Sequence, residues 1–556
     1  MKGCTYMVSN PNKNKQLTSR SIVIGCIGSA ILTASSLYMA LKMGALPWPI
    51  VFAALASVVC LRALGSNNLH EANVTHAAMS AGSMIAGGLA FTIPAMWMSD
   101  ASVDISVLEV LVCAICGCSL GLSACAKLQP YFIVKKDLPY PIGVSASDTL
   151  KATNTNNAKG AKALFGGMGL SAVYAVLRDN LSMLPSVLFG GVAIPNVAFG
   201  LINSPMICAL GYMIGGTMAL VWFIGAVVGN FGIAYLFPIL NICDIQTADA
   251  IRTSLGLGLM LGVGAGIIIL HSYKGIKNND NNTITHTTSS NPRVLTSHKY
   301  SEIVISILVA LTCTYILHIS LVASVILVAA IWFCVYLAAW LTGTTGVNPM
   351  EIFGVVVLLL IQLLFVATPS KTLFLCASIT AVACGIAGDV MNDLKAGDQL
   401  KTNPKDQFIG MCAGSAVGVI VASFLIVGMF KTYGAASFGP DGQFVSAQAC
   451  VVSVMAGGIP HTPAFIVGIA LGITMACLKL PVMTLGLGVY LPFYLSATAA
   501  LGALIKVIAD RRNALDDNES KALSEAKGQI IASGILGGES LVGVITALIA
   551  LGGAIF

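Results

Sequence analysis

Long apolar runs, separated by short polar segments, follow one another along almost the whole chain. The first run extends from about Ser21 to Leu41, and the last reaches residue 555. A run of roughly 20 apolar residues crosses a bilayer as a helix, because lipid offers no hydrogen-bond partner to an open backbone. Segments of about 10 residues with alternating polarity, typical of barrel strands, do not occur. The pattern predicts an all-α polytopic integral membrane protein with about 14 to 17 transmembrane passes.

Several runs are interrupted by Gly or Pro, which predicts broken or re-entrant helices. Two such segments are 138–152, with Pro141 and Gly143 marking the break, and 205–217. Unwound backbone supplies hydrogen-bonding groups without a buried charge. We therefore expect both segments to face counterparts from the second half of the chain across a central cavity.

Composition narrows the class further. Of the 556 residues, 9% are charged and 56% hydrophobic, whereas a soluble domain has about a quarter charged residues. These values exclude a soluble enzyme, a nucleic-acid binder and a disordered scaffold. The net charge of +6 comes from Lys and Arg in short loops, so the expected partner is a lipid bilayer and no nucleic acid. The 16 cysteines are scattered among apolar runs, where they pack as small apolar groups and imply no disulfide framework.

The positive charge of the loops predicts the topology. Residues 1–19 form a polar tail with three lysines and no acid, and the 272–300 linker is also basic. Since Lys and Arg collect on the cytoplasmic side, both segments are expected there, in the inner or plasma membrane of a bacterium. The last run then leaves the C-terminus outside. The linker separates a first transmembrane half, 20–271, from a second, 301–556.

The two halves share short motifs in the same order. Gly44-x-x-Pro47 recurs as Gly346-x-x-Pro349, and Ile85-Ala-Gly87 recurs as Ile386-Ala-Gly388, each about 300 positions later. A looser third pair is Gly215-Gly216 with Gly537-Gly538. Internal duplication is how many secondary transporters form two gates around one site, although channels and membrane enzymes also contain repeats.

Two small-residue patterns are interpreted as helix packing. Gly258, Gly262 and Gly266 form a GxxxGxxxG ridge that allows close approach of another helix. The CxxC of Cys113 and Cys116 stands alone on an apolar helix, so it predicts packing and no metal site. No cofactor is expected.

Longer motifs resemble one membrane-protein family. The first half contains Glu71-Ala-Asn73-Val-Thr-His76 and Leu138-Pro-Tyr-Pro141-Ile-Gly143. The second half contains Thr345-Gly346-Val-Asn348-Pro349, Ile386-Ala-Gly388-Asp389-Val-Met-Asn-Asp393-Leu-Lys395 with Gln407 beyond it, and Gly488-Val-Tyr490. Together they cover most of residues 20–555 and resemble the oligopeptide transporter (OPT) family, in particular its prokaryotic branch, which is related to the yellow-stripe-like metal-chelate transporters.

The resemblance implies a function. Members of this family are similar to proton-coupled symporters and import small peptides or iron–chelator complexes. Motif residues expected to line the substrate cavity are Asn73, Pro141, Gly143, Asn348, Gln407 and Tyr490. The proton is the expected coupling ion, and a homodimer is a further expectation.

Ionisable residues inside the apolar runs are candidates for coupling, because a charge in a membrane span is costly without a partner or water. Lys395 lies close in sequence to Asp389 and Asp393 and is a candidate too, since a cation there would favour the charged form of the two acids and oppose proton uptake. The two acids lie one helical turn apart. They are interpreted either as a charged pair on the transport path or as a solvated helix end, and the motif favours transport. We expect Asp389 or Asp393 to be more sensitive than His76.

The other candidates have two interpretations each. Glu539 is either a buried coupling carboxylate or a partner of a helix dipole. Glu71 is a further coupling candidate, and His76, five residues after it, is either a proton relay or a packed, hydrogen-bonded histidine. Glu109 is either a proton carrier or an interfacial glutamate. Lys42, at the end of the first run, either extends to the interface or binds a substrate carboxylate.

The leading hypothesis is a secondary active transporter that imports small peptides by alternating access, with metal chelates as the alternative substrate. The rival class is a channel or an integral membrane enzyme. The sequence contains no HExxH, Walker A, GxGxxG or GxSxG motif, so neither ATP-driven transport nor hydrolysis is indicated, and the protein is not expected to be an enzyme.

Overall fold

The structure is a computed structural model of the whole chain. It describes residues 15–43, 50–155, 157–190, 192, 194–277, 295, 300–345, 348, 350–365, 368–439, 442–457, 459–478, 483–512 and 518–555. The predictions for most of the 1–19 tail and of the 272–300 linker lie outside these residues.

The described chain is almost entirely helical. The elements up to residue 277 are α1 (Ser19–Met43), α2 (Ile50–Ala63), α3 (Leu69–Ser80), α4 (Ser83–Ala90), α5 (Ile93–Ser99), α6 (Val107–Gln129), η2 (Pro130–Lys135), α7 (Pro141–Thr155), α8 (Asn157–Ala175), η3 (Val176–Asn180), β1 (Val187–Leu188), β2 (Leu201–Ile202), α9 (Pro205–Ile214), α10 (Gly216–Ala226), η4 (Val227–Tyr235), α11 (Leu236–Ile239) and α12 (Ile245–Lys277). β1 and β2 pair antiparallel, Val187 opposite Ile202.

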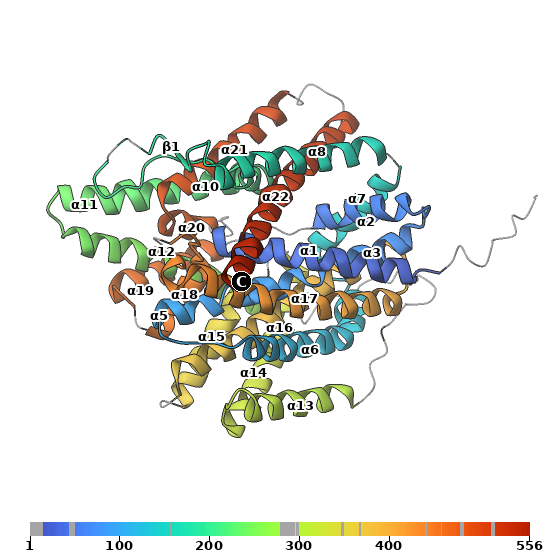
Figure 1. The fold of residues 1–556 in the computed structure, drawn as a ribbon. Helices are drawn as coiled ribbons and strands as arrows, with labels where there is room; N and C mark the ends of the chain where they lie inside the picture. Colours follow the sequence, from blue (N-terminus) through green and yellow to red (C-terminus); the bar gives the residue numbers. More distant parts are fainter. Residues whose placement is uncertain are drawn as a thin grey trace, which may run out of the picture.

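The remaining elements complete the bundle shown in Figure 1. They are α13 (Ser301–Tyr315), α14 (Leu321–Thr345), α15 (Met350–Leu364), α16 (Ser370–Leu400), α17 (Pro404–Tyr433), η6 (Ala435–Ser437), α18 (Ala447–Gly457), α19 (Thr462–Cys477), α20 (Met483–Tyr490), α21 (Phe493–Arg512) and α22 (Asn518–Ile555).

Length and apolar composition allow nine described helices to cross a membrane, and four shorter apolar helices accompany them. This agrees with the predicted all-α polytopic membrane fold, while the number of passes stays a prediction. Several helices are broken as expected. One continuous apolar stretch, 69–99, is divided into α3, α4 and α5, and Gly215 separates α9 from α10 with a φ of 90° that favours glycine.

The stretch 69–99 and α16 form the centre of the molecule. Each is 31 residues long, and the most apolar window of each is fully buried inside the protein. They cross closely at Gly88, where an added Cβ would lie 2.7 Å from the Val382 backbone nitrogen. Helices α6, α14, α15 and α17 pack around α16. A helix that is apolar all round and carries acids at one end is therefore shielded from lipid along its length.

The outer helices pack in exchanged pairs. α8 packs along α22 and α12 along α19, while α9 packs on α21 and α10 on α20. α1 and α14 are each 25 residues long. Such an exchange is what two duplicated halves related by a two-fold axis would produce, and the repeat stays a prediction.

The glycine ridge of α12 packs as predicted. Cβ atoms added at Gly262 and Gly266 would lie 2.8 and 3.0 Å from the Cα atoms of Ile469 and Ile473 on α19. A Cβ added at Gly472 of α19 would in return lie 2.6 Å from the Leu259 carbonyl oxygen of α12. The two backbones thus approach closely because neither carries a side chain at the crossing.

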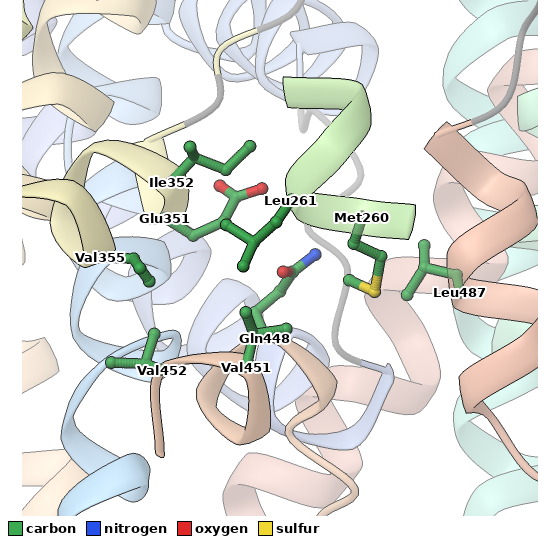
Figure 2. A pocket seen from close by; sticks show the side chains of 9 residues that line it. All are labelled: Met260, Leu261, Glu351, Ile352, Val355, Gln448, Val451, Val452 and Leu487. Carbon is green, nitrogen blue, oxygen red and sulfur yellow. The ribbon is translucent and has the colours of Figure 1, made fainter. Parts of the chain in front are cut away.

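A small cavity lies where α12 meets α15, α18 and α20 (Figure 2). About 20 Å³ of it admits the centre of a water molecule, which is room for about one water. A peptide does not fit, so this conformation is closed here. Its lining residues are Met260, Leu261, Glu351, Ile352, Val355, Gln448, Val451, Val452 and Leu487.

Candidate functional site

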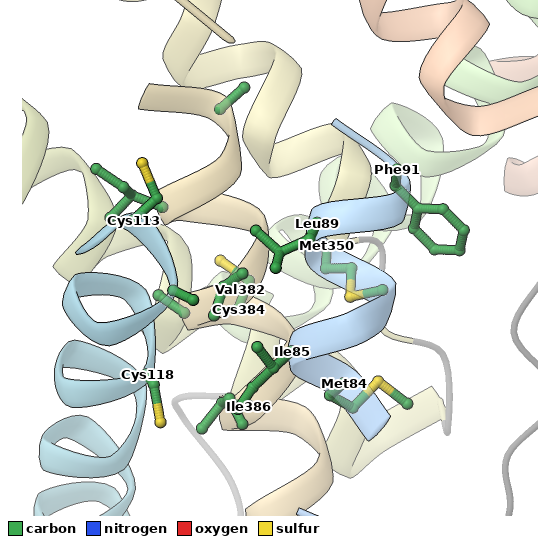
Figure 3. Packing of buried hydrophobic residues seen from close by; sticks show 14 of the residues in the cluster. Met84, Ile85, Leu89, Phe91, Cys113, Cys118, Met350, Val382, Cys384 and Ile386 are labelled. Atoms are coloured by element: carbon green, nitrogen blue, oxygen red, sulfur yellow. The ribbon is translucent and has the colours of Figure 1, made fainter. Parts of the chain in front are cut away.

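Helix α16 is held in place by tight packing of small and apolar side chains. Figure 3 shows Val382, Cys384 and Ile386 between residues of α4 and the cysteine-containing face of α6. An added Cβ at Gly117 of α6 would lie 2.6 Å from the Ile379 carbonyl. The cysteines of α6 are thus packing residues, and the described residues contain no group of three or more metal-ligating side chains that could hold an ion.

Beyond this apolar packing, α16 carries polar residues that meet α3 and α17. Six side chains form what we call the polar cluster, and all are buried. Its members are Asn73, His76 and Ser80 of α3, Asp389 and Asp393 of α16, and Gln407 of α17. The cluster thus brings together five residues that the sequence singled out, from segments far apart in the chain.

Asp393 is the most connected member of the cluster. Its Oδ2 accepts a hydrogen bond from Ser80 Oγ at 2.5 Å, and its Oδ1 lies 3.8 Å from His76 Nδ1. Gln407 Nε2 donates to the Asp393 backbone carbonyl at 2.5 Å. The carboxylate is therefore oriented from α3, whereas α17 binds the backbone of the same residue.

Other polar atoms of the cluster have no hydrogen-bond partner within the described chain. They are both oxygens of Asp389, both ring nitrogens of His76, Oδ1 of Asp393, both side-chain polar atoms of Asn73, and Oε1 of Gln407. Buried polar groups are almost always paired, and exceptions concentrate where a protein binds or moves something. The polar cluster is consequently the strongest candidate site in the molecule.

The first turn of α7 and Asn348, which precedes α15, contact α16 beside the cluster. The chain breaks before Pro141, where Tyr140 has a φ of 39°, and Gly143 N–H donates to Asn392 Oδ1 at 3.2 Å. On the other side, Asn348 Nδ2 donates to the Cys384 carbonyl at 2.9 Å. Gly143 and Asn348 thus contact α16. The break predicted in segment 138–152 lies before Pro141, the first residue of α7, whereas Gly143 lies inside that helix and does not mark a break.

Lys395 does not accompany the two acids, contrary to the expectation from sequence. Its Nζ pairs with Asp137 Oδ1 at 2.6 Å, in the loop before α7. Lys395 lies two positions beyond Asp393 on a helix, so it faces another direction. Its charge is compensated by Asp137, and the interpretation in which it opposes proton uptake is therefore unsupported.

Glu71 also lies outside the cluster. Its carboxylate accepts from Arg20 Nε at 2.6 Å, from Thr18 Oγ1 at 2.5 Å and from Ser66 Oγ at 2.5 Å. These bonds fasten the start of α1 to the start of α3. All three partners lie at or next to helix ends, so Glu71 has the geometry of a structural residue.

Glu109 occupies the first turn of α6 and has a local role. It forms a capping box with Ser106, since Ser106 N–H donates to Glu109 Oε2 at 2.8 Å. Its carboxylate also pairs with Lys371 Nζ at 2.7 Å and is partly exposed. This geometry favours the interfacial glutamate over the proton carrier.

Glu539 is buried in α22. The sequence left open whether it is a buried carboxylate or a partner of a helix dipole, and its contacts agree with both. Its Oε2 accepts from Met206 N–H at 2.8 Å at the start of α9, and Oε1 accepts from Ser204 Oγ at 2.7 Å. Arg178 Nη2 donates to Oε1 at 2.9 Å. Glu539 is therefore both a buried carboxylate and a partner for a helix N-terminus, although the helix is α9 and not its own.

Arg178 was missed by sequence reasoning. It sits in a short apolar run, and its guanidinium binds Asp179, Glu539 and the Asn203 carbonyl. Lys42 lies near this group and donates to Tyr38 Oη at 3.2 Å. An arginine within an apolar run was the available signal.

Tyr490 lies away from the polar cluster. It is buried at the end of α20 among residues that include Trp222 and Cys450, and its carbonyl accepts from Arg252 Nη1 at 2.9 Å. Its hydroxyl interacts with the side chain of Cys450. Tyr490 therefore belongs to a different part of the interior from the other motif residues.

Comparison with known proteins gives a consistent result. A family model described as OPT oligopeptide transporter protein matches residues 16–242 and 268–550. A protein of Haemophilus influenzae, named as a candidate oligopeptide transporter, is 25% identical over 593 residues, covering 92% of each chain. Since the family model spans most of the sequence, the chain belongs to the OPT oligopeptide transporter family.

Proposed function

We propose that this protein is a secondary active transporter that imports small peptides together with protons, by alternating access between its two halves. Membership of a transporter family supports transport and argues against an enzyme. The peptide follows the family's description and the name of the Haemophilus influenzae relative.

The observation that carries the coupling proposal is the pair His76 and Asp393. Both side chains are fully buried, and no Lys or Arg side chain neutralises Asp393 among its described contacts. A charge in such surroundings is costly, and binding of a proton removes it. The unpartnered oxygens of Asp389, one turn away, offer a second place for the same proton.

Alternating access requires two bodies that can move against each other. The exchanged pairs α8 with α22 and α12 with α19 support duplicated halves, 20–271 and 301–556, on the two sides of the 272–300 linker. The polar cluster joins them, because α3 belongs to the first half and α16 and α17 belong to the second. A change of protonation at the cluster would then alter the contact between the halves.

The same proposal includes a location in the bacterial inner or plasma membrane and a homodimer. It keeps metal chelates as the alternative substrate. A chelated metal needs no ligands from the protein, so the absence of a metal-ligating cluster among the described residues does not separate the two substrates.

Uptake into proteoliposomes tests the function. The purified protein is reconstituted with the inside alkaline, and labelled di- to pentapeptides and iron–siderophore or nicotianamine-like chelates are offered outside. The proposal expects a peptide to accumulate above its external concentration and the accumulation to vanish when a protonophore is added. Accumulation of a chelate alone would establish the alternative, and accumulation that needs sodium instead of a pH gradient would contradict proton coupling.

A further inference from the structure

A buried acid that does not belong to the polar cluster, Glu351, lines the cavity in Figure 2. Glu351 lies in the first turn of α15, directly after the Gly346-x-x-Pro349 motif, and is 8% exposed. Its carboxylate has no ion pair within the described chain, and the one hydrogen bond found for it there comes from its own backbone N–H. Since an unpaired carboxylate within a membrane protein is costly, a bound group is a better explanation than packing.

The surroundings of Glu351 define the charge and size of a ligand. The other polar side chain in the lining is Gln448 of α18, also buried and 7% exposed, and no hydrogen bond of its side chain is found within the described residues. The rest of the lining is aliphatic or Met. The site therefore presents one negative charge and one amide to a space of about 20 Å³.

An ammonium group matches this set. It carries one positive charge and three N–H donors, and a carboxylate and an amide oxygen are acceptors for them. An –NH₃⁺ head is close to water in size, and the cavity holds about one water. A divalent metal ion fits less well, because it requires several anionic or imidazole ligands and the described residues contain no such group.

The position of the cavity relates it to transport. Met260 and Leu261 come from α12, in residues 20–271, whereas Glu351, Gln448 and Leu487 come from residues beyond 301. A ligand there touches both predicted halves. It is also distinct from the polar cluster, since none of the cluster residues lines it.

We infer that Glu351 and Gln448 bind the free amino group of the transported peptide, so that the protein selects substrates with an unblocked N-terminus. This inference rests on the proposed function and assigns one subsite of it. In this conformation the cavity has room for the amino group alone. The rest of the peptide would occupy space that opens in another conformation.

The test compares one radiolabelled tripeptide with its N-acetylated form, using the full chain in detergent. For the wild type, the expected dissociation constant is at least about tenfold lower for the free amine, which is the usual effect of one buried charge pair. Glu351→Gln keeps the size of the side chain and removes its charge. In this variant the dissociation constants of the acetylated and the free peptide should differ by no more than about twofold.

Two further variants keep the result interpretable. Gln448→Met retains the volume and the charge of Glu351 but loses the amide oxygen, and it should lower the ratio severalfold even if Glu351→Gln does not fold. Glu302→Gln removes a carboxylate outside the cavity, where Glu302 pairs with Lys127, and should leave the ratio unchanged. Melting profiles report the folding of each variant.

The possible outcomes separate the claims. An unchanged ratio in both cavity variants, or a wild type that binds both peptides equally, overturns the inference and leaves proton-coupled peptide transport intact. If Glu351→Gln keeps the free-amine preference but loses gradient-driven accumulation, Glu351 carries a proton and the inference is also wrong. A wild type that neither binds nor transports any peptide contradicts the proposed function itself, and with it this subsite.

Discussion

His76 Nδ1 of α3 lies 3.8 Å from Asp393 Oδ1 of α16, and both side chains are excluded from solvent. This separation is longer than a hydrogen bond but short enough for a strong electrostatic interaction between the two groups. The pair connects the two predicted halves of the molecule at the polar cluster, where eight buried side-chain atoms have no hydrogen-bond partner within the described chain.

If the two residues share one proton, their substitutions will not act independently. We expect His76→Gln and Asp393→Asn each to reduce gradient-driven uptake strongly, and the double variant to be little worse than Asp393→Asn alone. A double-mutant cycle on initial uptake rates measures this, because residues in contact give coupling energies of about 0.5–3 kcal/mol. Additive losses would show that His76 acts elsewhere.

Glu71 lies on α3, as His76 does, but its carboxylate is fully hydrogen-bonded and is expected to stabilise the fold without taking part in coupling. Glu71→Gln should lower stability by roughly 1–3 kcal/mol, because Arg20, Ser66 and Thr18 lose their charged acceptor, and the partial exposure of Arg20 favours the lower end. Accumulation driven by a pH gradient should persist. Thermal unfolding in detergent and uptake at a permissive temperature measure the two effects. Loss of coupling in a stable variant would return Glu71 to the transport path.

The buried pair of Arg178 and Glu539 is expected to hold α22 against α9. Glu539→Gln should destabilise the fold by about 3–5 kcal/mol, because it leaves the buried guanidinium with only the partly exposed Asp179 as an anion. The double variant Arg178→Met with Glu539→Leu should be more stable than Glu539→Gln, since no charge then stays buried unpaired. Equal stability of the single and double variants would argue against a compensated ion pair.

The crossing of α12 and α19 depends on missing side chains. Gly262→Val should destabilise the protein by about 1–3 kcal/mol, because its Cβ would meet the Ile469 backbone at 2.8 Å. Gly166→Ala on α8 is the matched control, since an added Cβ there meets nothing within 4 Å. The control should be neutral or slightly stabilising, given the helix propensity of alanine. Melting temperatures that fall equally in both variants would contradict close helix contact as the cause.

The sequence predicted the membrane-spanning helical class because that class depends on composition. It also predicted the glycine ridge, since three glycines at intervals of four occupy one helix face whatever the helix meets. The break before Pro141 followed from proline chemistry in the same way. None of these features required knowledge of the contacts made between distant segments.

The make-up of the candidate site, in contrast, depends on contacts between segments that are far apart in the sequence. Asp389, Asp393, His76, Asn73 and Gln407 were all singled out, but only the packing of α3, α16 and α17 brings them into one cluster. The partner of Lys395 is Asp137, in a loop that no local pattern links to α16. Glu351 was not singled out, because an acid in the first turn of a helix is common, and only the packing of α12, α15 and α18 places this one against a cavity.

The central claim is that Asp393 carries the coupling proton, and the exchange behaviour of Asp393→Asn tests it most directly. Asparagine retains the size of the side chain and hydrogen-bonding capacity for Ser80 but cannot release or bind the proton. In proteoliposomes, the account expects no accumulation of peptide under an imposed pH gradient and near wild-type exchange of labelled for unlabelled peptide at equal pH. An Asp393→Asn protein that still concentrates peptide in response to the gradient would contradict the claim.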